Sequence, residues 1–255
     1  MSYVAAAFII ALSCTVGAFG VYLTRRIFSS ESLEKFNDVG GVVFLQVGVI
    51  YGVLLSFVAV LAWDQFAAAS SAVELEAAEL GTVYQLSKAI GSQRDQGVPD
   101  KVVKYLEAVI DDEWKEMKAG RESGKARHAL NELWNSTIAT PPQSRHEEIL
   151  YDEELDRLAS ARESRRLRIF QINLSVPTFM WVLMISVGAI AVGLSCFFGI
   201  ESLRSQMVLS ASLAITVSFV LSLILMLDQP FSGDLTVSKE PFEHMLNSIK
   251  QQQSQ

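Results

Sequence analysis

Four apolar stretches dominate the chain and limit what it can fold into. They cover residues 4–23, 41–63, 176–200 and 207–227, and none contains Asp, Glu, Lys, Arg or His. About 20 apolar residues in a helix cross the roughly 30 Å hydrocarbon layer of a membrane. We therefore predict an all-α, polytopic membrane protein with four transmembrane helices. The first stretch has no basic segment before it and exceeds the length of a signal-peptide core, so we expect an uncleaved span.

The second span gives no signal to stop at the membrane edge. From Val42 to Ile90 the chain contains no Pro, and beyond Asp64 apolar residues recur at helical intervals, at Phe66, Val73, Leu80, Val83 and Leu86. We predict one helix of about 48 residues that continues out of the bilayer. Its outer half is amphipathic and must pack against other helices.

The remaining polar segments define the domain organisation. Spans 1 and 2 occupy residues 1–63, a helical extramembrane domain is inserted over residues 64–175, a transmembrane hairpin covers 176–227, and a C-terminal tail covers 228–255. Within the inserted domain we predict helices over residues 101–118, with Asp100 as the cap, over 127–138 and over 147–171. Before the second span, Ser29 or Ser30 is expected to cap a short interfacial helix that ends at Gly40–Gly41.

Composition excludes several classes of function. The formal net charge of −7 disfavours a nucleic-acid partner, because phosphate binding needs a basic surface. The two cysteines, Cys14 and Cys196, fall inside predicted spans and are typical of small buried residues. The three histidines lack metal-ligand spacing, and no nucleophile, phosphate-loop or triad motif occurs. We expect no enzyme activity, no metal and no cofactor.

Two faces of the second span are candidates for function. On a helical wheel, Gly48, Gly52, Ser56 and Ala59 form a row of small residues, which favours close helix packing. The opposing face has polar ends, Gln46 and Asp64, and an apolar middle formed by Val53, Phe57 and Val60. This face is suited to line a pore with a hydrophobic constriction. The alternative, which spacing alone leaves open, is that it meets lipid or another span.

Two further segments have distinctive patterns. The cluster Arg162, Arg165, Arg166 and Arg168 precedes the third span, where it could bind anionic lipid headgroups or pair with the acids Glu74, Glu76 and Glu79. After the fourth span, "DQPFSG" combines Asp228, Pro230, Phe231 and Gly233, which is typical of a structural turn where the tail leaves the membrane. At 113–114, "EW" indicates a buried aromatic beside a solvated acid.

The topology follows from the number of spans. With four spans, the N-terminus, the helical domain and the C-terminus share one side of the membrane. Basic residues occur on both sides, so the positive-inside rule is divided; the arginines before the third span favour a cytoplasmic domain. The partner that this topology implies is the lipid bilayer. A nucleic-acid partner is not expected, because of the net negative charge.

Several quoted segments together resemble the bestrophin-like domain family, a group of uncharacterised bacterial membrane proteins. They are "YGVLLSFVAVLAWDQFAAA" (51–69), Glu74 and Glu76, "EW" (113–114), "RESRR" (162–166), "VPTFMW" (176–181) and "LDQPFSGDLTVSKEPF" (227–242). The resemblance implies a multi-pass protein of the bacterial inner (plasma) membrane and similarity to bestrophins, which are pentameric anion channels. It also implies that Val53, Phe57 and Val60 lie where bestrophins form the pore neck, and that the chain is a homo-oligomer, by this resemblance a pentamer.

Two functional hypotheses from different classes follow. The first is an oligomeric ion channel, for anions, in which the second span lines the pore. The second is a non-conducting membrane protein that anchors a helical interaction or sensor domain. They differ in whether the Val53, Phe57 and Val60 face points to the axis of an oligomer.

Overall fold

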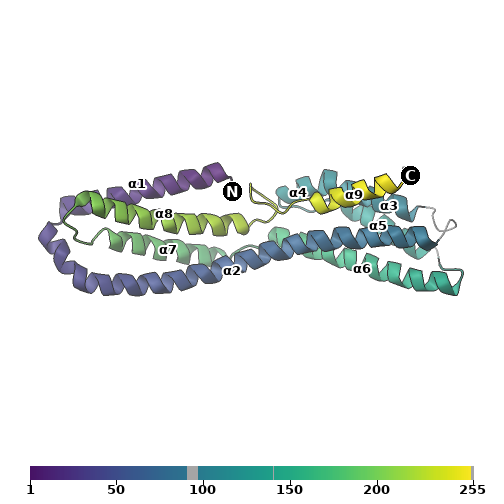
Figure 1. Cartoon of the computed structure of the whole chain (residues 1–255), viewed down its shortest axis with the longest axis horizontal. Coiled ribbons are helices and arrows are strands. Elements are labelled where there is room, and N and C mark those ends of the chain that lie inside the picture. Colours follow the sequence, from purple (N-terminus) through teal and green to yellow (C-terminus); the bar gives the residue numbers. More distant parts are fainter. Residues whose placement is uncertain (91–96, 140, 254–255) are drawn as a thin grey trace. The chain divides into compact units, whose positions relative to one another are not determined.

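A computed structural model describes residues 1–90, 97–139 and 141–253, and every regular element in these ranges is helical. Within these ranges, four helices are long and apolar enough to cross a membrane: α1 (Tyr3–Ile27), α2 (Ser30–Ile90), α7 (Thr178–Ser195) and α8 (Leu203–Leu227). The prediction of an all-α protein with four transmembrane helices is thus confirmed (Figure 1). The chain divides into two compact units.

The first unit comprises Met1–Asp64, Ser175–Asp228 and Gly233–Leu235, and holds α1, the first part of α2, α7 and α8. Helices α1 and α8 lie side by side in it (Figure 1). Their close approach depends on Gly17, because a Cβ added there would lie 3.0 Å from the carbonyl oxygen of Ser210 and 3.1 Å from Cβ of Ala214. Small residues at such contacts let membrane helices pack by van der Waals attraction.

Helix α2 is longer than predicted. It begins at Ser30 and runs without interruption through Gly40 and Gly41, so the prediction that these glycines end a separate interfacial helix is wrong. Neither glycine has the positive φ that would end a helix. The first turns are instead held by contacts within the unit: the side chain of Asn37 donates to the carbonyl of Gly199 and accepts from its N–H, both at 2.8 Å. The predicted run from Val42 to Ile90 is a single helix.

The second unit comprises Gln65–Leu174, Gln229–Ser232 and Thr236–Gln255. Residues 65–90 of α2 pack in it with α3 (Val98–Ala108), the π-helical segment η1 (Val109–Glu113), α4 (Trp114–Lys118), α5 (Gly124–Ala139), α6 (Arg145–Asn173) and α9 (Glu240–Gln253). Its core is formed by apolar residues from all of these elements, among them Leu80, Leu106, Leu133, Leu158 and Phe242. The amphipathic half of α2 therefore has the helical partners that its pattern requires.

Local details of the second unit differ from the sequence predictions. Helix α3 begins at Val98, with Pro99 in its first turn, so Asp100 lies inside the helix and is not its cap. The predicted helix over 101–118 is interrupted by the π-helical segment. Helix α9 was not predicted within the tail. The tail's last two residues, 254–255, and the loop residue 140 lie outside the described residues.

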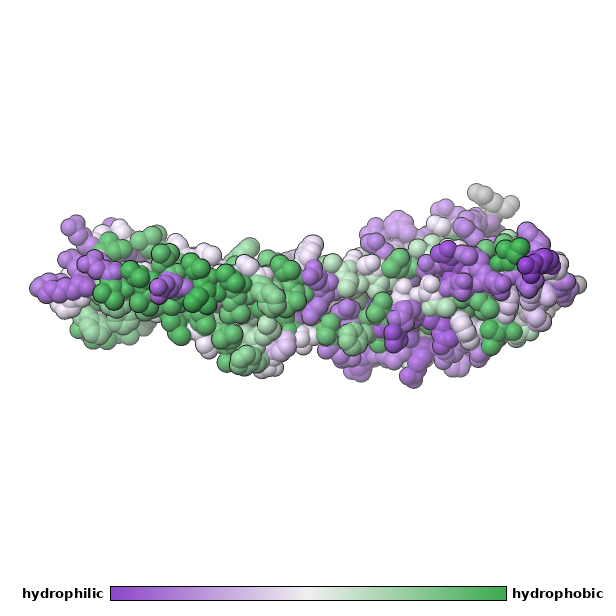
Figure 2. Space-filling model, turned by 90° about the horizontal axis from the view of Figure 1, so that it is seen from below, coloured by the Kyte–Doolittle hydropathy of each residue, from purple (hydrophilic) through white to green (hydrophobic). Residues whose placement is uncertain are grey.

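The two units have different surfaces. On the face shown in Figure 2, hydrophobic residues cover most of the unit that contains α1, α7 and α8, and hydrophilic residues cover most of the other. Apolar side chains such as Phe8, Phe19, Phe179 and Phe219 are largely exposed on the first unit. Because exposed apolar side chains are stable in hydrocarbon but not in water, this unit is the membrane part of the protein.

Candidate functional site

Within the first unit, one side of α2 is packed and the other is open. Tyr51, Leu55, Val58 and Ala62 are buried. Val53, Phe57 and Val60 are 67%, 58% and 58% exposed. These positions follow the 3.6-residue period, so the buried and exposed residues occupy roughly opposite faces of one helix. The candidate constriction residues therefore make little contact inside the chain and are free to face lipid, a pore or another subunit.

The exposed face of α2 also contains a groove. It has a volume of about 600 Å³ and is lined by Gly48, Val49, Gly52, Val53, Ser56, Phe57 and Val60. Apart from the nearby backbone of α2 itself, no atom of the described residues lies within 4 Å of a Cβ added at Gly48 or Gly52. These two glycines therefore do not pack against another helix of the described chain, and they border the candidate constriction. Gln46 and Asp64, the candidate pore ends, are both exposed.

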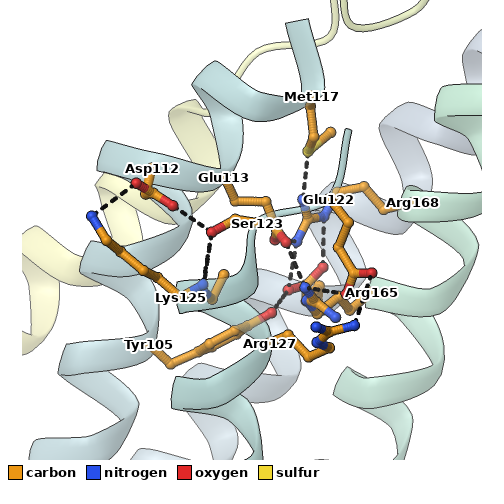
Figure 3. Close-up of polar contacts among 12 residues, drawn as sticks. Tyr105, Asp112, Glu113, Met117, Glu122, Ser123, Lys125, Arg127, Arg165 and Arg168 are labelled. Carbon is orange, nitrogen blue, oxygen red and sulfur yellow. Dashed lines mark hydrogen bonds and ion pairs between the residues drawn. The ribbon is translucent and has the colours of Figure 1, made fainter. Parts of the chain in front are cut away.

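In the second unit, the arginines before the third span enter a buried ion-pair network (Figure 3). Arg168 is fully buried; its Nε donates to Oε2 of Glu76 at 2.8 Å, and its Nη2 donates both to Oε1 of Glu76 at 3.0 Å and to Oε2 of Glu113 at 2.8 Å. Burial alone lowers the pKa of Arg168, but the carboxylates of Glu76 and Glu113 outweigh it and raise that pKa above its ordinary value. The guanidinium is therefore permanently charged.

Arg165 and Tyr105 complete this network. Arg165 donates to Oε1 of Glu113 at 2.5 Å and to Oε1 of Glu122 at 3.1 Å, and the hydroxyl of Tyr105 donates to Glu76. Burial, followed by the negative charge of Glu76, raises the pKa of Tyr105 well above its ordinary value, so the phenol stays protonated and serves as a donor. The two fully buried carboxylates, Glu76 and Glu113, thus balance two buried guanidinium groups.

Two members of the network were not predicted from the sequence. Glu113 was expected to be solvated, and this is wrong because its side chain is fully buried. No polar role was predicted for Tyr105. Tyr105, Val109, Glu113 and Met117 recur at every fourth position, and all four are buried. A step of four residues over-rotates by about 40° in an α-helix, and the wider π-helical turn at 109–113 compensates and keeps Glu113 on the buried side.

The other two arginines of the cluster are outside the network. Arg166 pairs with Glu163 one turn away, at 2.7 Å, and both side chains are largely exposed. The guanidinium carbon of Arg162 lies 4.5 Å from the ring centre of Trp134. Of the acids proposed as partners for the cluster, Glu76 binds Arg168, Glu79 lies 3.4 Å from Arg157, and Glu74 is exposed.

The residues after the fourth span make separate structural contacts within each unit. In the first unit, Asp228 accepts a hydrogen bond from the N–H of Val176 at 2.6 Å, and Gly233 has a φ of 95°. In the second unit, the carbonyl of Pro230 accepts from the N–H of Val237 at 2.8 Å. The ring of Phe231 packs edge-on against Trp114, with 6.0 Å between ring centres. These contacts involve backbone and core groups and present no reactive side chain.

Comparisons with known proteins place this architecture in a family. The model of the Bestrophin-like domain matches residues 11–242. The chain belongs to the Bestrophin-like domain family. All the candidate residues of this Bestrophin-like chain, from Gln46 to Gly233, fall inside the matched range.

Solved structures have the same fold. One crystal structure of a bacterial bestrophin homologue from Klebsiella pneumoniae superposes with a TM-score of 0.73 at 13% identity, covering 96% of the Bestrophin-like chain and 99% of the homologue. A second has a TM-score of 0.67 at 16% identity, covering 95% and 96%. Another similar structure, with a TM-score of 0.66 at 15% identity over 95% of this chain and 96% of the other, is described as a membrane protein. A search of curated proteins found no match. The Bestrophin-like chain is therefore a membrane protein with the fold of bacterial bestrophin homologues.

Proposed function

We propose that the chain is one subunit of an oligomeric, bestrophin-like anion channel of the bacterial inner membrane, with α2 lining the pore. The observation that carries this proposal is the unpacked face of α2, where exposed Val53, Phe57 and Val60 lie between exposed polar residues in a chain of the Bestrophin-like family. In the proposed topology both termini and the helical domain, residues 64–175, are cytoplasmic.

The spacing of the polar residues supports a pore that crosses the bilayer. Gln46 and Asp64 are separated by 18 helical positions, which corresponds to about 27 Å. This distance is close to the hydrocarbon thickness of a bilayer. Between them, Val53, Phe57 and Val60 occupy less than two turns of the helix. A ring of such side chains from several subunits would form a short apolar constriction that gates by excluding water.

The open groove supports assembly around that constriction. Gly48 and Gly52 leave room on α2 for another helix to approach closely, and no part of the described chain fills it. Helix association in a membrane depends on such close contact. In the proposed homo-oligomer, a neighbouring subunit covers the side of the groove with the glycines, and Phe57 projects toward the axis.

The test is ion flux from liposomes that contain the purified oligomer, with empty liposomes as the baseline. We expect chloride flux above the baseline, and a larger flux for Phe57→Ala, because a smaller side chain widens the constriction. Phe8→Ala is the matched control, since Phe8 is 69% exposed on α1 and the same atoms are removed. It is expected to leave the flux unchanged.

Other outcomes would redirect the assignment. Potassium flux without chloride flux would retain the pore and reject anion selectivity. Equal flux for the Phe57 and Phe8 variants would remove α2 from the pore lining. No flux from the wild type or from Phe57→Ala would favour a non-conducting protein that anchors the helical domain as an interaction or sensor module.

A further inference from the structure

A second cavity lies in the helical unit, between α5 and α6. It has a volume of about 550 Å³, and four arginines line it: Arg127 from α5, and Arg162, Arg165 and Arg166 from α6. The only carboxylates in the lining are Glu122 and Glu163. Even when Arg165 is assigned to the buried network, three guanidinium groups face two carboxylates. The cavity is thus locally basic on a chain with a net charge of −7.

The arginines of the cavity are incompletely paired. Nε of Arg165 is buried and has no hydrogen-bond partner among the described residues. Arg162 lies over the ring of Trp134, and no carboxylate of the described residues forms an ion pair with it. A buried donor without a partner costs free energy, so Glu113 and Glu122 do not fully satisfy the guanidinium of Arg165. Arg165 and Arg166 follow Arg162 by three and four residues, so all three lie near one another on α6, and they line the cavity together with Arg127.

Glu122 occupies the place where an anion would bind. Figure 3 shows its carboxylate between Arg165 and Arg127, and the distances are 3.1 Å and 3.8 Å. It belongs to the short turn between α4 and α5, and its side chain is 32% exposed. A carboxylate in this position neutralises the site when it is empty and can swing toward solvent when a more highly charged anion arrives.

The rest of the lining suits an organic group. Leu130, Trp134 and Ile169 supply apolar surface beside the guanidinium groups. Planar guanidinium forks match phosphate oxygens two at a time, and the cavity is large enough for more than the phosphate itself. We propose that this cavity binds the phosphoryl group of a phosphate monoester, with Arg127, Arg162 and Arg166 as its ligands and Glu122 as the group it displaces. The inference is independent of whether the chain conducts ions.

The proposal is tested by calorimetric titration of the purified full chain in detergent with inorganic phosphate, phenyl phosphate and dihexanoyl phosphatidic acid. Dihexanoyl phosphatidylcholine, a phosphodiester, is the negative probe. Losing one charged ligand should raise Kd about tenfold in Arg127→Gln and in Arg166→Gln. Glu122→Gln should lower Kd, because it removes the competing carboxylate. Arg145→Gln is the matched control. Arg145 and Arg166 both lie on α6, are both exposed, and each forms an ion pair with a glutamate three residues away, Glu148 and Glu163 respectively. Arg145 does not line the cavity.

The probes distinguish the source of the ligand. Binding of phenyl phosphate with this order of Kd values supports a soluble phosphate monoester, and binding of phosphatidic acid alone with the same order supports a lipid headgroup. Failure of all three phosphate probes at millimolar concentration would overturn the proposal. It would also be overturned if Arg145→Gln weakened binding as much as Arg166→Gln, or if phosphatidylcholine bound equally well.

Discussion

Arg168 donates two hydrogen bonds to Glu76, from Nε to Oε2 at 2.8 Å and from a terminal nitrogen to Oε1 at 3.0 Å. Both side chains are fully buried. The two residues are 92 positions apart in the chain. The pair therefore joins α2 to α6 inside the helical unit, and a third contact to Glu113 joins both to the π-helical segment.

Replacing Arg168 should destabilise the protein strongly. Arg168→Met leaves the carboxylates of Glu76 and Glu113 buried without their main partner, which typically costs about 3–5 kcal/mol. We expect a large fall in the thermal midpoint of the detergent-solubilised protein, followed by tryptophan fluorescence. Arg166→Met is the control. The ion pair of Arg166 with Glu163 is largely exposed, so its loss should leave the thermal midpoint almost unchanged.

A double variant checks the cause of that loss. Adding Glu76→Gln to Arg168→Met removes one of the stranded charges, so the double variant should be more stable than Arg168→Met alone. If the two losses simply added, the fall would come from lost packing and not from unpaired buried charge.

Tyr105 should give the stability a dependence on alkaline pH. Burial and the charge of Glu76 raise the pKa of Tyr105 in the folded protein well above its unfolded value near 10. The folded state then keeps a proton that the unfolded state releases, so this stabilisation is complete below pH 10 and declines as the pH rises further. Tyr105→Phe should be less stable at pH 8 and should lose less stability between pH 9.5 and 11. Thermal midpoints across this range measure both effects, and parallel curves for wild type and variant would contradict the expectation.

Gly199→Ala should disturb the membrane unit. A Cβ at Gly199 would lie 2.4 Å from the backbone nitrogen of Glu34 and 2.6 Å from the carbonyl carbon of Leu33. Backbone atoms at such distances cannot move aside as a side-chain tip can, so we expect a loss of about 1–3 kcal/mol from overpacking. Gly193→Ala on α7 is the control, since apart from the nearby backbone of α7 itself no atom of the described residues lies within 4 Å of its added Cβ. A thermal midpoint for Gly199→Ala equal to that of the control would refute this prediction.

Asp228 should stabilise the first unit through its hydrogen bond to Val176. Asp228→Ala leaves the buried N–H of Val176 without its acceptor, which typically costs about 1–3 kcal/mol. Asp228→Asn keeps an acceptor oxygen of similar reach and should recover part of the stability. Thermal unfolding of the two variants compares the loss of the acceptor with the loss of the charge. If Asp228→Asn were as destabilised as Asp228→Ala, the charge of Asp228 and not its acceptor oxygen would be the stabilising feature.

Several features of the fold were predictable because they follow from local pattern. The four spans and the uninterrupted run from Val42 to Ile90 depend on apolar length, helical spacing and the absence of Pro. The start of α2 depends on tertiary contacts instead: Asn37 binds Gly199, which is 162 residues away, and a single sequence carries no trace of that pairing. Helix α9 could have been predicted in part, because Phe242, Leu246 and Ile249 have helical spacing. Pro241 is compatible with this helix, since proline is favourable in the first turn.

The candidate site divides in the same way. The residues that share the exposed face of α2 could be predicted from the sequence, because helical periodicity determines which residues share a face. The pairing of Arg168 with Glu76 and Glu113 could not, because helical period can indicate which of the four arginines are buried but not which carboxylates they meet. Arg165 and Arg168 continue the buried spacing of Leu158 and Ala161 on α6, whereas Arg162 and Arg166 fall off it. That period would have distinguished the two pairs.

The π-helical segment at Val109–Glu113 sets a limit on how this sequence can change in length. Removing one residue there would restore a regular α-helix, but it would also turn Trp114 and Met117 away from the core in which both are buried. A chain that buries Glu113, Trp114 and Met117 in this core therefore needs the extra residue of the π-helical turn, whatever side chains surround it.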